Sequence, residues 1–102
     1  MEELILPIAK HTCMNIIKDV IEELGWKIEE SKENVIKAST GFSIRSWGEV
    51  VTISIKGYGI DKIRLIIKSK PRAQAIDWGK SRENEIIFKE TVLSFLKDGD
   101  YI

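Results

Sequence analysis

The stretch EVVTISIKGYGIDKIRLIIKSK, residues 49–70, determines the fold, because apolar and polar side chains alternate on both sides of a glycine-rich turn. This period of two predicts two strands, 49–57 and 62–70, joined by the turn 57–61 as an antiparallel hairpin. One side of each strand is apolar: Val51, Ile53, Ile55, Ile63, Leu65 and Ile67. The other side is polar or charged: Thr52, Ser54, Lys56, Lys62, Arg64 and Lys68. Such a sheet buries one face and exposes the other.

Segments that precede this hairpin continue the pattern. GWKIEE (25–30) and NVIKAST (34–40) also alternate with a period of two. The polar turn SKEN between them predicts a second hairpin. The run LILPIA (4–9) predicts an edge strand, because proline cannot donate a hydrogen bond to a neighbouring strand.

Two segments have the spacing of amphipathic helices. The first follows Thr12, the expected N-cap, and ends before Gly25, which favours a helix C-terminus. Its apolar positions are Cys13, Ile16, Ile17, Val20, Ile21 and Leu24. The second follows Ser81 as its cap, with Glu83 and Glu85 in the first turn, where carboxylates complement the helix dipole. Its apolar arc consists of Ile86, Ile87, Phe88, Val92, Leu93, Phe95 and Leu96.

The expected order of elements is strand, helix, four strands and helix, within one α+β domain covering residues 1–102. Helices at both ends of an antiparallel meander pack on one face of the sheet, which here has five strands. The face under the helices is expected to bury Trp26, Ile28, Ile53, Ile55, Leu65 and Ile67.

This β-α-β4-α order resembles the TATA-binding-protein-like fold, which also includes the helix-grip and Bet v 1-like domains. The resemblance covers nearly the whole chain and implies its topology, but no motif of those families places a functional residue here. The stretches GW at Gly25, SWGE at Ser46 and DWGK at Asp77 are similar to a pattern in small uncharacterised prokaryotic proteins. That second resemblance implies no activity.

The composition is typical of a soluble globular domain, with 43% hydrophobic and 31% charged residues in a chain of 102. Sixteen basic and sixteen acidic residues give zero net charge, so only an uneven distribution of charge would favour a polyanionic partner. The opening MEELILPIAKH lacks the basic start of a signal peptide, and no apolar stretch is long enough to span a membrane. We therefore expect a cytoplasmic domain without a membrane partner.

Few groups suited to catalysis are present. His11 is the only histidine, and its spacing from Cys13 points the two side chains of a helix in different directions. Cys13, the sole cysteine, occupies an apolar position, which favours a buried structural residue over a reactive thiol. No glycine-rich phosphate loop precedes a helix. We expect a non-enzymatic protein with no catalytic residue, metal or cofactor.

Two Trp-Gly pairs at expected structural boundaries provide the first functional hypothesis. The glycine after each tryptophan permits a bend or the close approach of another backbone. Trp47 and Trp78 either close the ends of the core or flank a site between the sheet and the last helix. In the second case Arg45 and Lys80 supply polar contacts, and the domain binds a protein or a small molecule.

The polar side of the predicted sheet provides the alternative hypothesis, an anion or nucleic-acid binder. Its cations are Lys37, Lys56, Lys62, Arg64 and Lys68, with Lys27 and Lys70 at the margins. Glu29 is the expected main acid, and no aromatic side chain is expected there for base stacking. The same lysines are also typical of an ordinary solvated sheet. A third possibility, association of sheet edges into a weak homodimer rather than a monomer, stays open.

Overall fold

The computed structural model describes residues 1–41, 48–71 and 79–99. Its elements are β1 (Glu2–Leu6), α1 (Lys10–Glu23), β2 (Lys27–Ser31), β3 (Val35–Ser39), β4 (Glu49–Tyr58), β5 (Lys62–Pro71) and α2 (Lys80–Asp98). This order confirms the predicted α+β class and the β-α-β-β-β-β-α topology.

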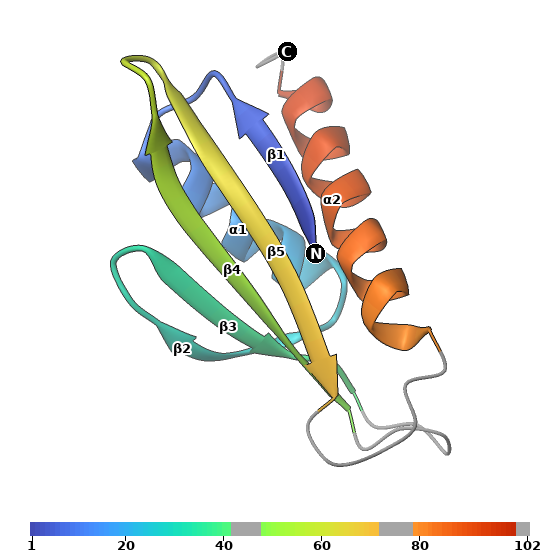
Figure 1. The fold of residues 1–102 in the computed structure, drawn as a ribbon. Helices are drawn as coiled ribbons and strands as arrows, with labels where there is room; N and C mark the ends of the chain where they lie inside the picture. Colours follow the sequence, from blue (N-terminus) through green and yellow to red (C-terminus); the bar gives the residue numbers. More distant parts are fainter. Residues whose placement is uncertain (42–47, 72–78, 100–102) are drawn as a thin grey trace.

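The five strands form one antiparallel sheet in the order β1-β5-β4-β3-β2. The first strand therefore lies at an edge, as predicted, and Pro7 follows it directly. Both helices lie on the same side of the sheet: β4 and β5 pass in front of α1, and α2 runs beside β1 (Figure 1). The opposite side, which we call the outer face, is not covered by a helix.

The apolar side of the long hairpin forms the core, so the predicted division of β4 and β5 into two faces is confirmed. Ile53, Leu65 and Ile67 are fully buried, whereas Thr52, Ser54 and Arg64 remain partly exposed. The helices contribute the rest of the core, chiefly Cys13, Ile16, Ile17, Val20 and Ile21 from α1, and Phe88, Val92 and Leu96 from α2.

The prediction fails for two residues of the expected buried set, Ile28 and Trp26. Ile28 is opposite Ala38 and so belongs to the helix side of the sheet, but its side chain is 38% exposed. It lies on β2, the edge strand, which has only one neighbouring strand to cover it. Trp26, just before that strand, is half-buried and stacks on Phe88 with ring centroids 5.8 Å apart.

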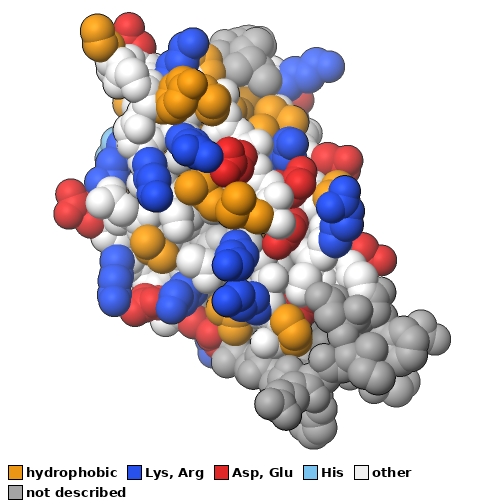
Figure 2. Space-filling model, in the orientation of Figure 1, with side chains coloured by type: hydrophobic (Ala, Val, Ile, Leu, Met, Phe, Trp, Pro, Cys, Tyr) orange, Lys and Arg blue, Asp and Glu red, His pale blue; other side chains and the backbone are white. Residues whose placement is uncertain are grey.

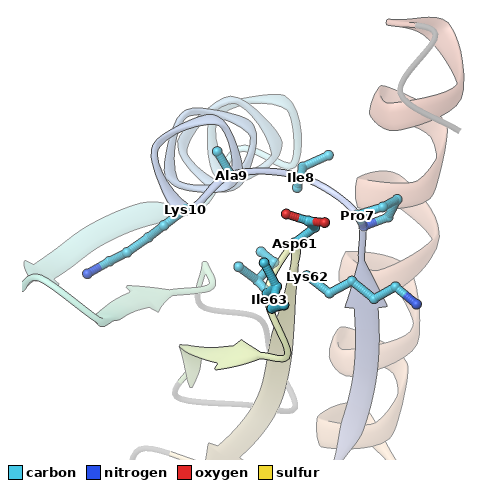
Figure 3. Close-up of a pocket in the computed structure, with 8 residues that line it drawn as sticks. Pro7, Ile8, Ala9, Lys10, Asp61, Lys62 and Ile63 are labelled. Atoms are coloured by element: carbon cyan, nitrogen blue, oxygen red, sulfur yellow. The ribbon is translucent and has the colours of Figure 1, made fainter.

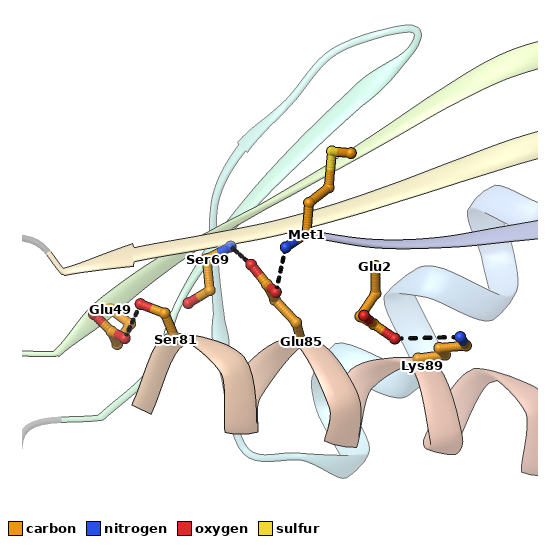
Figure 4. Close-up of polar contacts among 7 residues, drawn as sticks. All are labelled: Met1, Glu2, Glu49, Ser69, Ser81, Glu85 and Lys89. Carbon is orange, nitrogen blue, oxygen red and sulfur yellow. Dashed lines mark hydrogen bonds and ion pairs between the residues drawn. The ribbon is translucent and has the colours of Figure 1, made fainter. Parts of the chain in front are cut away.

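The predicted N-caps of both helices are also wrong. The first helix begins at Lys10 after Ala9, and the second begins at Lys80 after Gly79. The hydroxyl of Ser81 instead donates a hydrogen bond of 2.7 Å to Oε1 of Glu49, a buried residue at the start of β4 (Figure 4). The Ser81 side chain, which the local pattern assigned to capping the helix, therefore makes a tertiary contact with the sheet instead.

Glu85 has a different role from the predicted one. Because α2 starts two residues earlier than expected, Glu85 lies beyond its first turn and faces the sheet. Its carboxylate accepts a 2.9 Å hydrogen bond from the backbone N–H of Ser69 and lies 2.8 Å from the amino group of Met1. This buried acid joins α2 to β5, rather than balancing the helix dipole at the surface (Figure 4).

Candidate functional site

Most of the predicted Trp-Gly site falls outside the described residues. Arg45, Trp47 and Trp78 belong to the ranges 42–47 and 72–78, so binding beside them stays a prediction. Lys80, the fourth residue of that site, is exposed at the start of α2 and lies 4.0 Å from the Glu83 carboxylate.

The glycines of both Trp-Gly pairs are described, and both adopt left-handed backbone conformations. Gly48 has φ of +94°, and a Cβ atom there would lie 3.0 Å from the backbone oxygen of Thr40. Gly79 has φ of +86° and precedes the first residue of α2. The chain bends at Gly79, and at Gly48 the close approach of another backbone is present; glycine permits both.

The outer face of the sheet brings the alternative set of residues together. Across the strands, Lys37 is opposite Thr52, and Thr52 is opposite Lys68. Nearer the end of the long hairpin, Lys56 is opposite Arg64, and Tyr58 is opposite Lys62. All five predicted cations, Lys37, Lys56, Lys62, Arg64 and Lys68, therefore share one side of the sheet. Figure 2 shows blue Lys and Arg side chains spread over this view, with hydrophobic groups between them.

A hollow of about 310 Å³ lies on this face where β3, β4 and β5 run side by side. Among the described residues it is lined by Lys37, Val50, Thr52, Lys68 and Lys70, which are three cations and no carboxylate. Its volume is at the lower end of the range for small-ligand pockets, roughly 300–1,000 Å³. The Thr52 hydroxyl adds a hydrogen-bond donor between two of the lysines. This arrangement favours an anion.

Two of the predicted cations are paired with acids. Arg64 makes hydrogen bonds of 2.7 and 2.8 Å to the two carboxylate oxygens of Glu3, and this contact raises the pKa of the guanidinium. Lys37 lies 3.6 Å from Glu30, which is also 3.0 Å from Lys32. The hydrogen bond from Lys32, together with its charge, lowers the pKa of Glu30.

The remaining cations of the outer face are available to a ligand. Within the part of the chain that the structure describes, Lys56, Lys62, Lys68 and Lys70 have no carboxylate within ion-pair distance. An uncompensated cluster of like charges attracts anions more strongly than the same number of paired cations. The hollow therefore contains two of these four lysines, Lys68 and Lys70.

A β-bulge in β2 determines which glutamate lies opposite Lys37 on the outer face. The register of β2 against β3 shifts between Ile28 and Glu30, so Glu30 is opposite Lys37. Strict alternation had assigned that place to Glu29. A bulge inserts one residue without a partner, and every later residue of the strand then changes its place relative to the neighbour.

The sequence reasoning missed Tyr58 on the outer face. The strand β4 continues through Gly57 to Tyr58, whose side chain is 46% exposed. It lies near Arg64 on the same face, since Lys62, opposite Tyr58, and Arg64 both point outward from β5. The alternation of the strand could have placed it there, because Tyr58 is an even number of residues from Thr52, Ser54 and Lys56. It was missed because the segment GYGID was interpreted as a glycine-rich turn.

A second hollow of about 310 Å³ lies at the end of the long hairpin, against the connection between β1 and α1. Its lining includes Pro7, Ile8, Lys10, Asp61 and Lys62, and the Asp61 carboxylate lies close to Ile8 and Pro7 (Figure 3). Figure 3 shows the amino groups of Lys10 and Lys62 pointing away from this carboxylate, and Lys10 lies 3.4 Å from Glu33 instead. The hollow on the outer face, whose described lining includes three cations and no acid, is therefore the better candidate for an anion.

Cys13 is buried on α1, as expected for a structural residue. Burial raises the pKa of its thiol to about 12. Among residues 1–41, 48–71 and 79–99, no group of three or more His, Cys, Asp and Glu side chains is arranged to hold a metal ion.

We expect Cys13 to react slowly with a thiol reagent at neutral pH in the folded protein. A pKa of about 12 in place of 9.0 reduces the thiolate fraction about a thousandfold, and the buried sulfur is also inaccessible. Absorbance of the released chromophore from a disulfide reagent measures the rate, with the protein in denaturant as the control. Rapid stoichiometric labelling of the folded protein would show that the thiol is reactive.

No helix in the described part of the chain has the length and apolar character needed to cross a membrane. The chain matches no protein-family model and no curated protein.

Proposed function

We propose that this protein binds polyanions through the outer face of its sheet. The observation that carries the proposal is the hollow lined by Lys37, Lys68 and Lys70, whose described lining includes no carboxylate. The sequence made this the alternative to a site beside Trp47 and Trp78. The geometry of the described residues supports it better, because its cations belong to neighbouring strands and face the same way.

The spacing of the lysines suits phosphate groups along a chain. Lys68 and Lys70 project from the same side of β5, two residues apart, which corresponds to about 6.6–6.8 Å along a strand. Lys37 approaches from β3 on the other side of Thr52. A polyanion bound here releases counterions, so its affinity falls as the salt concentration rises.

The test is a triple charge reversal, Lys37→Glu, Lys68→Glu and Lys70→Glu. The matched control reverses three exposed cations of the helices, Lys18→Glu, Arg82→Glu and Lys97→Glu, which changes the net charge equally. Fluorescence anisotropy of labelled heparin and labelled DNA is measured over a range of salt concentrations. Thermal unfolding followed by circular dichroism checks that both variants fold.

Wild-type protein should bind with an affinity that falls with salt, and the helix variant should retain most of that binding. The sheet variant should lose it, with the slope of log affinity against log salt falling by about 1 for each phosphate contact removed. Equal losses in the two variants would show that only net charge matters. Failure of the wild-type protein to bind either probe would overturn the proposal.

Two broader inferences accompany this proposal. The likeness of the β-α-β4-α order to the TATA-binding-protein-like fold is supported by the five-stranded sheet with both helices on one side. We also propose a cytoplasmic location, which is consistent with the single buried cysteine.

A further inference from the structure

We infer that the polyanion is a single-stranded nucleic acid whose backbone follows β5 and one of whose bases stacks on Tyr58. This inference rests on the proposed function, because it names the class of polyanion that the outer face binds. It uses the hairpin end of that face, at Tyr58, as well as the hollow near Lys68 and Lys70.

The cations of the outer face lie mainly along one strand. On β5, the outward positions are Lys62, Arg64, Ile66, Lys68 and Lys70, so four of the five are basic. At about 3.4 Å per residue, this line extends for about 27 Å from Lys62 to Lys70. A single line of cations fits one phosphate backbone, whereas a duplex presents two. Ile66 interrupts the line and Arg64 is paired with Glu3, so Lys62, Lys68 and Lys70 are the cations available to phosphates.

Tyr58 lies beside the hairpin end of this line. It is opposite Lys62 in the register of the hairpin, and almost half of its side chain is exposed. No other aromatic residue of the described ranges lies on this face: Trp26, Phe88 and Phe95 pack on the helix side. An exposed ring next to backbone-binding cations is the arrangement by which proteins hold unpaired bases.

The stacking partner distinguishes single strands from duplexes. In a duplex, both faces of each base are covered by its neighbours, so Tyr58 can stack only where a base is unpaired or at an end. Half-buried Val50 and Ile66, which lie between the cations, offer apolar contact to sugars and bases along the same path. These groups would contribute little to binding of a sulfated polysaccharide.

The experiment compares Tyr58→Ala with Tyr58→Phe, which keeps the ring and removes only the hydroxyl. Each variant is titrated with single-stranded DNA, duplex DNA of equal length and heparin at one salt concentration. The wild-type protein should bind the single strand more tightly than the duplex. Tyr58→Ala should weaken binding of the single strand by about 5- to 100-fold and leave heparin binding unchanged, and Tyr58→Phe should remain close to wild type.

The outcomes separate this inference from the proposed function. If none of the three probes binds, the proposed function fails and this inference fails with it. If heparin binds with salt dependence but Tyr58→Ala leaves the affinity for single strands unchanged, only this inference is overturned. Equal affinity for duplex and single strand would overturn it as well.

Vesicles containing phosphatidylserine provide a further arm, because Ile60 at the tip of the hairpin is 99% exposed and lies between Tyr58 and Lys62. Binding to vesicles that is lost in Ile60→Ser, without binding of oligonucleotides, would assign this end of the sheet to a lipid surface and overturn the inference. We expect the oligonucleotides, and not the vesicles, to bind.

Discussion

Replacing Phe88 by alanine should lower the free energy of unfolding by about 3–5 kcal/mol, the range for truncation of a buried aromatic side chain. Phe88 is fully buried on α2, where its ring stacks on Trp26 at an interplanar angle of 16°. The substitution removes contacts in the core, including the one with that indole, and it leaves a cavity that the surrounding residues close only in part. Urea unfolding followed by circular dichroism measures the loss.

Comparison with Trp26→Ala shows whether the loss of stability depends on how deeply the ring is buried or on how large it is. Trp26 is larger than Phe88 but only half-buried, so its truncation should cost less than that of Phe88. A loss below about 1 kcal/mol for Phe88→Ala, within the range of surface substitutions, would contradict the core described here. A larger loss for Trp26→Ala than for Phe88→Ala would do the same.

Replacing Glu85 by alanine should lower the free energy of unfolding by about 2–3 kcal/mol, because it leaves a buried backbone N–H without an acceptor. That N–H belongs to Ser69 on β5, and the hydrogen bond is 2.9 Å long (Figure 4). The ion pair with the Met1 amino group contributes less, since Met1 is half-exposed and water screens the interaction. Thermal and urea unfolding both report the change.

Glu85→Gln is the matched control, because its amide oxygen can still accept the hydrogen bond from Ser69. It should cost about 1 kcal/mol, which corresponds to the exchange of a charged acceptor for a neutral one. Equal losses in the two variants would show that the charge, and not the bond to the Ser69 N–H, stabilises this contact. Neither variant should change binding to polyanions, since Glu85 lies on the helix side of the sheet.

Much of the fold could be predicted from local periodicity. The alternation of Val51, Ile53 and Ile55 with Thr52 and Ser54 predicted which side of β4 would be buried, and the structure confirms it. This works because side chains of a strand alternate whatever its neighbours are. By the same rule Tyr58 should have been placed on the outer face, and it was missed only because its two neighbouring glycines suggested a turn.

Other features depended on contacts that local patterns do not contain. The helix starts predicted at Thr12 and Ser81 were wrong. At Ser81 the side chain bonds to Glu49 of β4, because a capping side chain can bond elsewhere once another element approaches it. The exposure of Ile28 follows from the position of β2 at the edge of the sheet, which depends on how five separate segments pair. The bond of Ser81 and the exposure of Ile28 were therefore decided by residues distant in the sequence.

The same distinction between local pattern and tertiary contact applies to the candidate site. The sequence by itself determined that Lys37, Lys62, Arg64 and Lys68 would lie on the polar sides of their strands, because a period of two requires only neighbouring residues. Only the tertiary structure decided that Lys37 meets Lys68 and Lys70 around one hollow, and that Glu3 neutralises Arg64. Strand order, register and the bulge in β2 determine those distances, and they result from packing of the whole chain.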